Sequence, residues 1–251
     1  MEEDPTWRSG GSKSSSRGTA NSRQGRPIQG GYQYCTVPCL QALKNGSYHP
    51  LCPNADDHKN APFDLDSVID DLLECMEANE REVIGGGNSG SCVAVRSLKY
   101  GHLVVVKAYH EKTETVLSDT ELEVYDHLSE LQGIYIPLLL ANVSAVYNGT
   151  RRRLLFMSYG GIPLHRCTAN DELVDNLAKA CIAIRANGII LDDSSPANVL
   201  ANGGNVAVID FEMAYIVDPP SPDALDRFKE DVEDLAERIK KDGWPLTELL
   251  P

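Results

Sequence analysis

The sequence lacks any apolar run close to the length that a membrane-spanning helix requires. A helix needs about 20 consecutive apolar residues to cross a bilayer, and no stretch of the chain approaches that length. The first ten residues, MEEDPTWRSG, also lack the hydrophobic segment of a signal peptide. We therefore expect a soluble intracellular protein, cytoplasmic or nuclear, without a membrane partner.

Positive charge is scarce over most of the chain. The net charge is −14, and after residue 60 there are 16 lysines and arginines against 32 acidic residues. Up to residue 60 the balance is slightly positive, with seven basic residues against five acidic ones. Nucleic acids and anionic membranes need a positive partner surface. The composition therefore argues against both as ligands of the main body.

Aliphatic residues are almost absent from residues 1–32, where glycine and serine dominate. Such a segment cannot bury enough apolar surface to offset the entropy lost on ordering. We expect residues 1–32 to form a disordered arm. A solvated tail is one interpretation, and a flexible segment that touches an anionic partner is the other.

The seven cysteines do not suggest a disulfide framework, because their number is odd and no secretion signal accompanies them. Residues 33–62 hold Cys35, Cys39, Cys52 and His58 in the pattern CxxxC, twelve residues, CxxxxxH. Thiolates and imidazole are the ligands that tetrahedral Zn²⁺ prefers. The pattern predicts a small separate zinc unit, with His49 as a substitute ligand. Three buried structural cysteines at a packing junction are the alternative.

Apolar periodicity predicts the secondary structure of the rest of the chain. Residues 63–80 are predicted to form an amphipathic helix behind a cap at Asp64 or Asp66. The other predicted elements are strands at 93–98, 103–109, 136–147, 152–159, 198–201 and 205–210, and helices at 114–131, 171–187 and 223–241. This order predicts an α+β fold in which a mostly antiparallel sheet precedes a helical part.

A glycine cluster stands before the first of these strands. Gly85, Gly87 and Gly90 spell GxGxxG within IGGGNSGSCVAV. Glycines suit a loop whose backbone approaches phosphates closely, although they also form ordinary turns. Because the cluster leads into a strand rather than a helix, it fits a hairpin loop better than a dinucleotide-binding turn.

A lysine closes the apolar run LVVVKAY that follows. Lys107 lies 22 residues after Gly85, where its ammonium needs either an anionic partner or a route to solvent. Glu121 on the next predicted helix is the candidate partner, and it could hold the lysine on nucleotide phosphates. The nearby Glu123 is the alternative.

Three polar residues are spaced along the segment ANGIILDDSSPANVLANGGNVAVIDFEMA. Asp193 is followed by Asn198 after five residues and by Asp210 after twelve more. One carboxylate can orient an attacking hydroxyl, while an amide oxygen and a second carboxylate hold Mg²⁺. Each residue alone is also a common turn residue. The glycines, the lysine and these three residues follow one another along the chain in a fixed order. Together they predict an ATP- and Mg²⁺-dependent phosphotransferase.

These segments resemble the motifs of protein kinases. GGGNSG, VVVK, Glu121, DDSSPAN and IDFE are similar to the glycine loop, strand lysine, helix glutamate, catalytic loop and metal-binding motif of that family. FMSYGG resembles a hinge, with Met157 at the gatekeeper position. The sequence as a whole is similar to a group of fungal kinase-like proteins. The DxSPxN segment resembles the catalytic loop of aminoglycoside and choline phosphotransferases.

The resemblance implies a two-lobed kinase-like domain over residues 81–251. Its first lobe would span about 81–157 and its reduced second lobe about 162–243. It implies transfer of a phosphate from ATP to a hydroxyl of a protein serine or threonine, or of a small molecule. The implied residues are Asp193, Lys107 and Glu121 for catalysis, Gly85, Gly87, Gly90, Lys107, Met157 and Tyr159 for ATP, and Asn198 and Asp210 for Mg²⁺.

The sequence departs from the kinase pattern at several positions. Leu191 stands where the family keeps a histidine, Glu212 replaces the last glycine of the metal-binding motif, and Asp192 adds a carboxylate beside Asp193. Only a short stretch separates Asp210 from the last predicted helix, which leaves no room for a full activation segment. These departures favour the alternative of a pseudokinase that acts as a nucleotide-binding or partner-docking scaffold.

Overall fold

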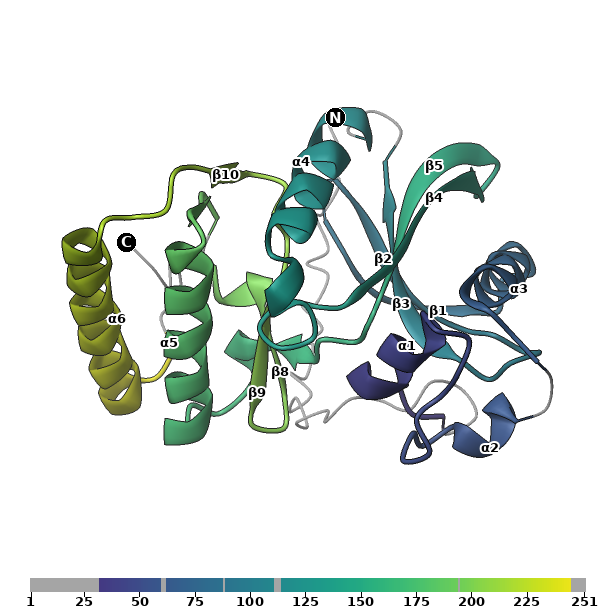
Figure 1. Cartoon of the computed structure of the whole chain (residues 1–251), viewed down its shortest axis with the longest axis horizontal. Helices are drawn as coiled ribbons and strands as arrows, with labels where there is room; N and C mark the ends of the chain where they lie inside the picture. The colour runs from purple at the N-terminus through teal and green to yellow at the C-terminus, as the bar shows by residue number, and fades with distance from the viewer. Residues whose placement is uncertain (1–31, 60–61, 88, 111–113, 194, 245–251) are drawn as a thin grey trace, which may run out of the picture.

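The computed structural model of the chain describes residues 32–59, 62–87, 89–110, 114–193 and 195–244. The predicted disordered arm, 1–32, therefore lies outside the described residues except for Tyr32. The described residues form an α+β fold with a mostly antiparallel sheet and several helices (Figure 1). The predicted fold class is confirmed at this level.

The main sheet is antiparallel and has the strand order β1-β2-β3-β5-β4. Its strands are β1 (Arg81–Gly86), β2 (Gly90–Arg96), β3 (Leu103–Tyr109), β4 (Leu139–Tyr147) and β5 (Thr150–Met157). The predicted hairpin turns are present, with positive φ at Gly101, Asn148 and Gly149. Glycine and asparagine tolerate this left-handed backbone, which the tight turns need. Every residue of β3 is buried.

The N-terminal helices pack on one face of this sheet. They are α1 (Val37–Leu43), α2 (Ala55–His58) and α3 (Leu65–Glu77). The carboxylate of Asp64 caps α3 by accepting the Ser67 backbone N–H at 2.8 Å. The helices share one apolar core with the sheet, which includes Cys39, Leu40, Leu43, Val68, Leu72, Val93, Val95, Val104, Val106, Leu154 and Phe156. The segment predicted as a separate unit at 33–62 therefore packs on the sheet in a common core.

The second half of the chain forms a helical core with two small sheets. Its helices are α4 (Glu114–His127), α5 (Asp171–Ala186) and α6 (Pro222–Asp242), with short 3-10 turns at Ser129–Leu131, Leu164–Arg166 and Pro196–Asn198. The strands are β6 (Ile162–Pro163), β8 (Val199–Asn202) and β9 (Asn205–Val208) in one sheet, and β7 (Ile189–Leu191) and β10 (Ala214–Ile216) in the other. Figure 1 shows α5 and α6 side by side at one end of the molecule.

The helix α4 joins the two halves. Its Val124 and Tyr125 are buried in the helical core, and Tyr125 meets the ring of Phe211 edge-on. Its Leu117 and Leu122 pack instead against the main sheet. In Figure 1, α4 lies between the sheet and the α5–α6 pair. The helix therefore packs against both parts of the molecule and can place side chains at the junction between them.

None of the helices in the described part of the chain combines the length and the apolar character that crossing a bilayer requires. The longest of these, α6, spans 21 residues. It buries only one stripe against α5, formed by Val232, Leu235, Ala236 and Ile239. It is therefore an amphipathic surface helix of the helical core.

Candidate functional site

Lys107 lies within β3, and only 11% of its side chain is exposed. Its Nζ lies 2.6 Å from Glu121 Oε2, 3.0 Å from Asp210 Oδ1 and 2.8 Å from Glu212 Oε1. The first two contacts are hydrogen bonds. The alternative partner, Glu123, is exposed. The anionic partner that the sequence requires is therefore Glu121 from α4, joined by two carboxylates from the distant loop after β9.

Burial and charge oppose each other at this lysine. Burial disfavours the charged ammonium, but the carboxylates of Glu121, Asp210 and Glu212, with Tyr109, raise the pKa of Lys107 well above its usual value. Burial also raises the pKa of Glu121, against the effect of Lys107. The Tyr109 hydroxyl donates a second hydrogen bond to the same Glu121 oxygen. Glu121 is thus fixed from two sides.

The three carboxylates form a compact acidic group. Oxygen atoms of Glu121, Asp210 and Glu212 lie within 4.8 Å of one another. One ammonium cannot neutralise three carboxylates, so the group retains the capacity to attract a cation. Carboxylate oxygens are the ligands that Mg²⁺ prefers. Sequence reasoning noted Glu212 as a replacement for the last glycine of the metal-binding motif but did not predict its ion pair with Lys107.

Asp210 adopts an unusual backbone conformation, with φ at +69°. The left-handed region costs a residue other than glycine on the order of 1 kcal/mol, and it recurs at functional sites. The preceding Ile209 N–H donates to the Asn198 carbonyl at 2.8 Å, next to the β8–β9 pairing. This hydrogen bond holds Asn198 close to Asp210, whose carboxylate reaches Lys107.

Asp193 is linked to the same group. The Asn198 side-chain amide donates to the Asp193 carbonyl at 3.3 Å. The Asp193 carboxylate accepts the Ser195 backbone N–H at 3.1 Å and is exposed. The structure therefore joins Asp193 to Asn198, and Asn198 to the strand end before Asp210. An exposed carboxylate at this place is accessible to an acceptor molecule.

The glycine cluster forms the hairpin turn between β1 and β2. Gly85 lies in β1, and the Gly87 N–H donates to the Gly90 carbonyl at 2.9 Å across the turn. A Cβ on Gly90 would lie 2.4 Å from the Ala108 carbonyl oxygen, so strand packing alone requires glycine there. A Cβ on Gly87 would meet nothing within 4 Å. Packing therefore does not account for the glycine at position 87.

A small apolar cluster covers the face of the sheet that carries Lys107. Alternate residues of a strand share a face, so Val105 and Tyr109 point the same way as Lys107. The buried members are Val105, Tyr109, Leu155 and Met157, and the partly buried members are Tyr34, Cys92, Leu117, Leu122, Leu139 and Tyr159. Met157 and Tyr159, predicted to bind ATP, thus border the same face as the lysine.

Sequence reasoning missed Tyr34, because it lies just after the segment predicted as a disordered arm. Its ring stacks on the Tyr159 ring with centroids 3.8 Å apart and planes 5° apart. Tyr109 was missed as well, although its position two residues after Lys107 places it on the same face of the strand. Tyr34 carried no comparable local signal, since its contacts are all distant in sequence.

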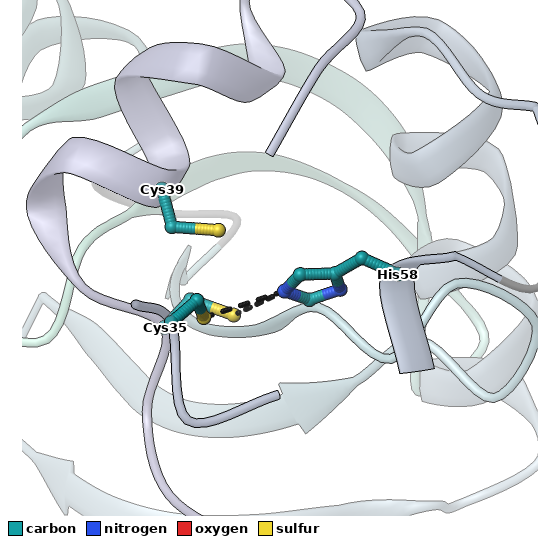
Figure 2. Close-up of side chains that lie close together, drawn as sticks. Cys35, Cys39 and His58 are labelled. Atoms are coloured by element: carbon teal, nitrogen blue, oxygen red, sulfur yellow. Dashed lines mark hydrogen bonds between the residues drawn. The ribbon is translucent and has the colours of Figure 1, made fainter. Parts of the chain in front are cut away.

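The predicted cysteine and histidine ligands come together in the core between the helices and the sheet. Figure 2 shows Cys35 and Cys39 with the His58 ring. The His58 Nε2 lies 3.6 Å from Cys35 Sγ and 3.3 Å from Cys52 Sγ. All four candidate ligand atoms, including Cys39 Sγ, lie within 4.8 Å of one another, and all four residues are buried. This group could hold a metal ion.

The contacts around His58 orient its ring toward the thiols. The Tyr100 carbonyl accepts a hydrogen bond from His58 Nδ1 at 2.8 Å, which leaves Nε2 as the ring atom facing the cysteines. His102 stacks on the His58 ring with centroids 4.0 Å apart, and burial lowers the pKa of His102 to about 3. The substitute ligand His49 is not in the group, and its Nδ1 accepts the Leu51 N–H.

Hydrogen bonds between the thiols and the imidazole shift the pKa values of both kinds of group. Burial opposes the charged form of His58, but hydrogen bonds with Cys39 and Cys52 raise the pKa of His58 to about 10. Hydrogen bonds with Cys35 and Cys39 lower the pKa of Cys52 far below its usual value. A buried thiolate beside a nitrogen ligand matches the donor set of structural Zn²⁺ sites.

Comparison with known proteins gives a distant relationship. No protein-family model matches the chain. It is similar to the meiotic driver SPOK2 of Podospora anserina, with 30% identity over 217 residues that cover 78% of the chain. The chain spans only 28% of that relative's length. The similarity therefore concerns one portion of a longer protein.

Proposed function

We propose that this chain is an ATP- and Mg²⁺-dependent phosphotransferase with a two-lobed, protein-kinase-like fold. The first lobe would hold the main sheet and the second the α5–α6 core, with the nucleotide between them. The acceptor would be a hydroxyl of a protein serine or threonine, or of a small molecule. The observation that carries this proposal is the hydrogen-bonded group of Lys107, Glu121 and Asp210.

Packing alone gives no reason for this group. A buried ion pair is often no more stabilising than apolar side chains of similar volume. Lys107, Glu121 and Asp210 nevertheless come from β3, α4 and the loop after β9, and they meet at one point. Such a group suits a site where an ammonium holds phosphates and a carboxylate holds the accompanying Mg²⁺. We infer that nucleotide phosphates would replace Asp210 and Glu212 as the partners of Lys107.

The remaining predicted residues fit defined roles in this scheme. Asp210 and Asn198 would hold Mg²⁺, which supplies neutralising charge on the phosphates. Asp193 would orient the acceptor hydroxyl and accept its proton. The acceptor oxygen then bonds to the γ-phosphorus as the bond to the β–γ bridging oxygen breaks, which releases ADP. The glycine turn at Gly87 would let backbone N–H groups approach the phosphates.

We propose Zn²⁺ as the metal held by Cys35, Cys39, Cys52 and His58. The three thiols and one imidazole provide a closed set of four ligands, as structural zinc sites require. All four residues are buried, so no position is left for substrate. The metal would stabilise the junction between the helices and the sheet and would take no part in phosphate transfer.

A pseudokinase scaffold is the second candidate, and Glu212 favours it. Its carboxylate lies 2.8 Å from Lys107 Nζ and is only 8% exposed, so it competes directly with phosphate for the ammonium. Leu191 removes the polar anchor that the kinase family keeps in the catalytic loop. Because the chain is similar to part of a meiotic driver, meiotic drive is the setting in which we would seek the acceptor or docking partner.

Release of ADP and transfer of ³²P from γ-labelled ATP would separate the two candidates. We expect wild type with Mg²⁺ to form ADP and to label itself or an added acceptor, drawn from proteins and small hydroxylated molecules. Asp193→Asn should abolish turnover and leave ATP binding intact, whereas the control Asp192→Asn should stay active. Wild type that binds ATP but forms no ADP under any of these conditions would favour the scaffold.

A further inference from the structure

The Tyr34 ring lies on the same face of the main sheet as the Lys107 ammonium. It packs in the apolar cluster that contains Val105 and Met157. The strand register confirms the shared face, because Cys92 is paired with Lys107 and Met157 with Val105. Tyr34 is partly buried there and stacks flat on Tyr159. An aromatic ring from outside the sheet thus fills part of the cluster beside the lysine.

The position of this ring matches the place that a nucleotide base would take. This step rests on the proposed function, in which Lys107 holds the phosphates. A base must then lie on the same face, and Val105 stands two residues along β3, about 7 Å from Lys107. The surrounding Cys92, Val105 and Met157 side chains are apolar. A flat apolar site at this distance suits a purine ring.

Contacts on both sides of Tyr34 hold it in place. The Cys35 N–H donates to the Leu103 carbonyl at 3.3 Å, and the Leu103 N–H donates to Cys35 Sγ at 3.4 Å. On the other side, the Asn54 side chain donates to the Gln33 carbonyl at 2.7 Å. The segment is therefore fixed to the first residue of β3 and to the N-cap of α2. Its ring position is defined by the fold and not only by the stack with Tyr159.

We infer that the Tyr34 ring occupies the base site of the nucleotide cleft, so that Gln33 and Tyr34 form a gate that must open before a nucleotide binds. With the two ring centroids 3.8 Å apart, no base can enter between Tyr34 and Tyr159. Tyr34 offers the same flat shape that the base would offer. Cys35, the next residue, also belongs to the cysteine and histidine group. The gate is therefore attached to that group by one peptide bond.

Calorimetric titration of MgATP into the whole chain tests this gate. If the closed gate is about 90% populated, Tyr34→Ala should tighten the apparent Kd about tenfold, because the binding-competent fraction limits affinity. Tyr34→Phe keeps the ring and should match wild type. Tyr32→Ala is the matched control, since Tyr32 lies two residues away and its ring packs against the Arg96 guanidinium. It should leave the Kd unchanged.

The outcomes separate the gate from the proposed function. If wild type binds MgATP, Lys107→Ala does not, and folded Tyr34→Ala binds no tighter than wild type, the gate is wrong and the phosphotransferase stands. If folded wild type and Tyr34→Ala both fail to bind, both proposals are wrong. Should Tyr34→Ala fail to fold, Tyr34→Trp provides the test. Its larger ring should weaken binding several-fold, and an unchanged Kd would overturn the gate.

Discussion

At the scale of single residues, Lys107 is the residue on which the proposed site depends. Its ammonium is surrounded by Glu121, Asp210 and Glu212 within 3.0 Å. Any anionic ligand that approaches must compete with these carboxylates. Glu212 is the residue whose replacement should favour such a ligand most, because its buried carboxylate lies 2.8 Å from the ammonium and has no role in the proposed magnesium site.

Removing this ammonium should destabilise the fold in a way that depends on pH. Lys107→Met leaves buried carboxylates without a cation, so we expect a loss of about 3 kcal/mol in the free energy of unfolding at pH 7. Burial raises the pKa of Glu121, and loss of the Lys107 ammonium would raise it further, so the folded variant binds more protons than the unfolded chain. Its stability should therefore rise as the pH falls from 7 to 5. Urea denaturation at both values measures this.

The exposed Lys179 provides the control for that experiment. Lys179→Met changes the same side chain on the surface of α5, where the lysine is exposed and donates a hydrogen bond to Asn176. Its stability should match wild type within about 0.5 kcal/mol. Equal losses in the two variants, or a Lys107→Met loss that does not change with pH, would show that the carboxylates do not need this lysine.

Two of the three carboxylates around this lysine were predictable from the sequence, and the third was not. Lys107 and Glu121 were predictable because a charge in a buried strand requires an opposite charge, and a helix glutamate was available. The distant Asp210 was placed by its motif. The contact of Glu212 with the lysine was not predicted, because it depends on the left-handed turn at Asp210. A backbone conformation of that kind leaves no periodic pattern in the sequence.

At the scale of elements, the hairpin β1–β2 contains one glycine that strand packing requires and one that packing does not explain. Gly90→Ala should cost about 2 kcal/mol of stability, since its Cβ would overlap the Ala108 carbonyl and force β2 from β3. Gly87→Ala has open space and should keep the stability of wild type. Under the proposed function it should still weaken MgATP binding several-fold. Thermal unfolding and calorimetry test the pair.

The opposite pattern would contradict this assignment. A Gly87→Ala variant that unfolds early would mean that the turn needs glycine for its own conformation. A stable Gly87→Ala variant with unchanged nucleotide affinity would remove the glycine turn from the phosphate site. Gly90→Ala with the stability of wild type would show that the strands can separate at low cost.

Long elements were predictable from the sequence, whereas the shortest ones, of two or three residues, were not. The helices α3, α5 and α6 repeat apolar residues over at least three turns, and their predicted ranges match the structure closely. By contrast, β6 spans two residues and β7 three. Elements of that length have no periodicity to detect. They exist because their partners in the small sheets supply hydrogen bonds.

At the scale of the whole molecule, the cysteine and histidine group joins the N-terminal segment to the sheet. Its residues share a core with β2 and β3, so loss of a bound metal should weaken the entire sheet. Sequence reasoning predicted the four ligands from their spacing but expected a separate unit. Contacts between α1 and the sheet link residues distant in the chain, and no local pattern indicates them.

We expect the purified chain to carry one equivalent of zinc, measured by plasma mass spectrometry. Cys39→Ala should lose this metal, and with zinc at a thousandfold its Kd the stability lost would be about 4 kcal/mol. Cys75→Ala is the control, because Cys75 is buried in the same core but lies outside the group. It should lose packing energy and keep its zinc. Wild type without bound zinc, and indifferent to a chelator, would leave only a structural role for the cysteines.

The central claim is that Lys107 and Asp210 form a magnesium-dependent nucleotide site, and ATP titration by calorimetry with and without Mg²⁺ tests it most directly. We predict saturable binding that requires Mg²⁺, is lost in Asp210→Asn and Lys107→Ala, and persists in Asp218→Asn, whose carboxylate is exposed beyond β10. Folded wild type and folded Tyr34→Ala that both show no binding at millimolar MgATP would contradict the claim. So would binding that survives the Asp210→Asn substitution unchanged.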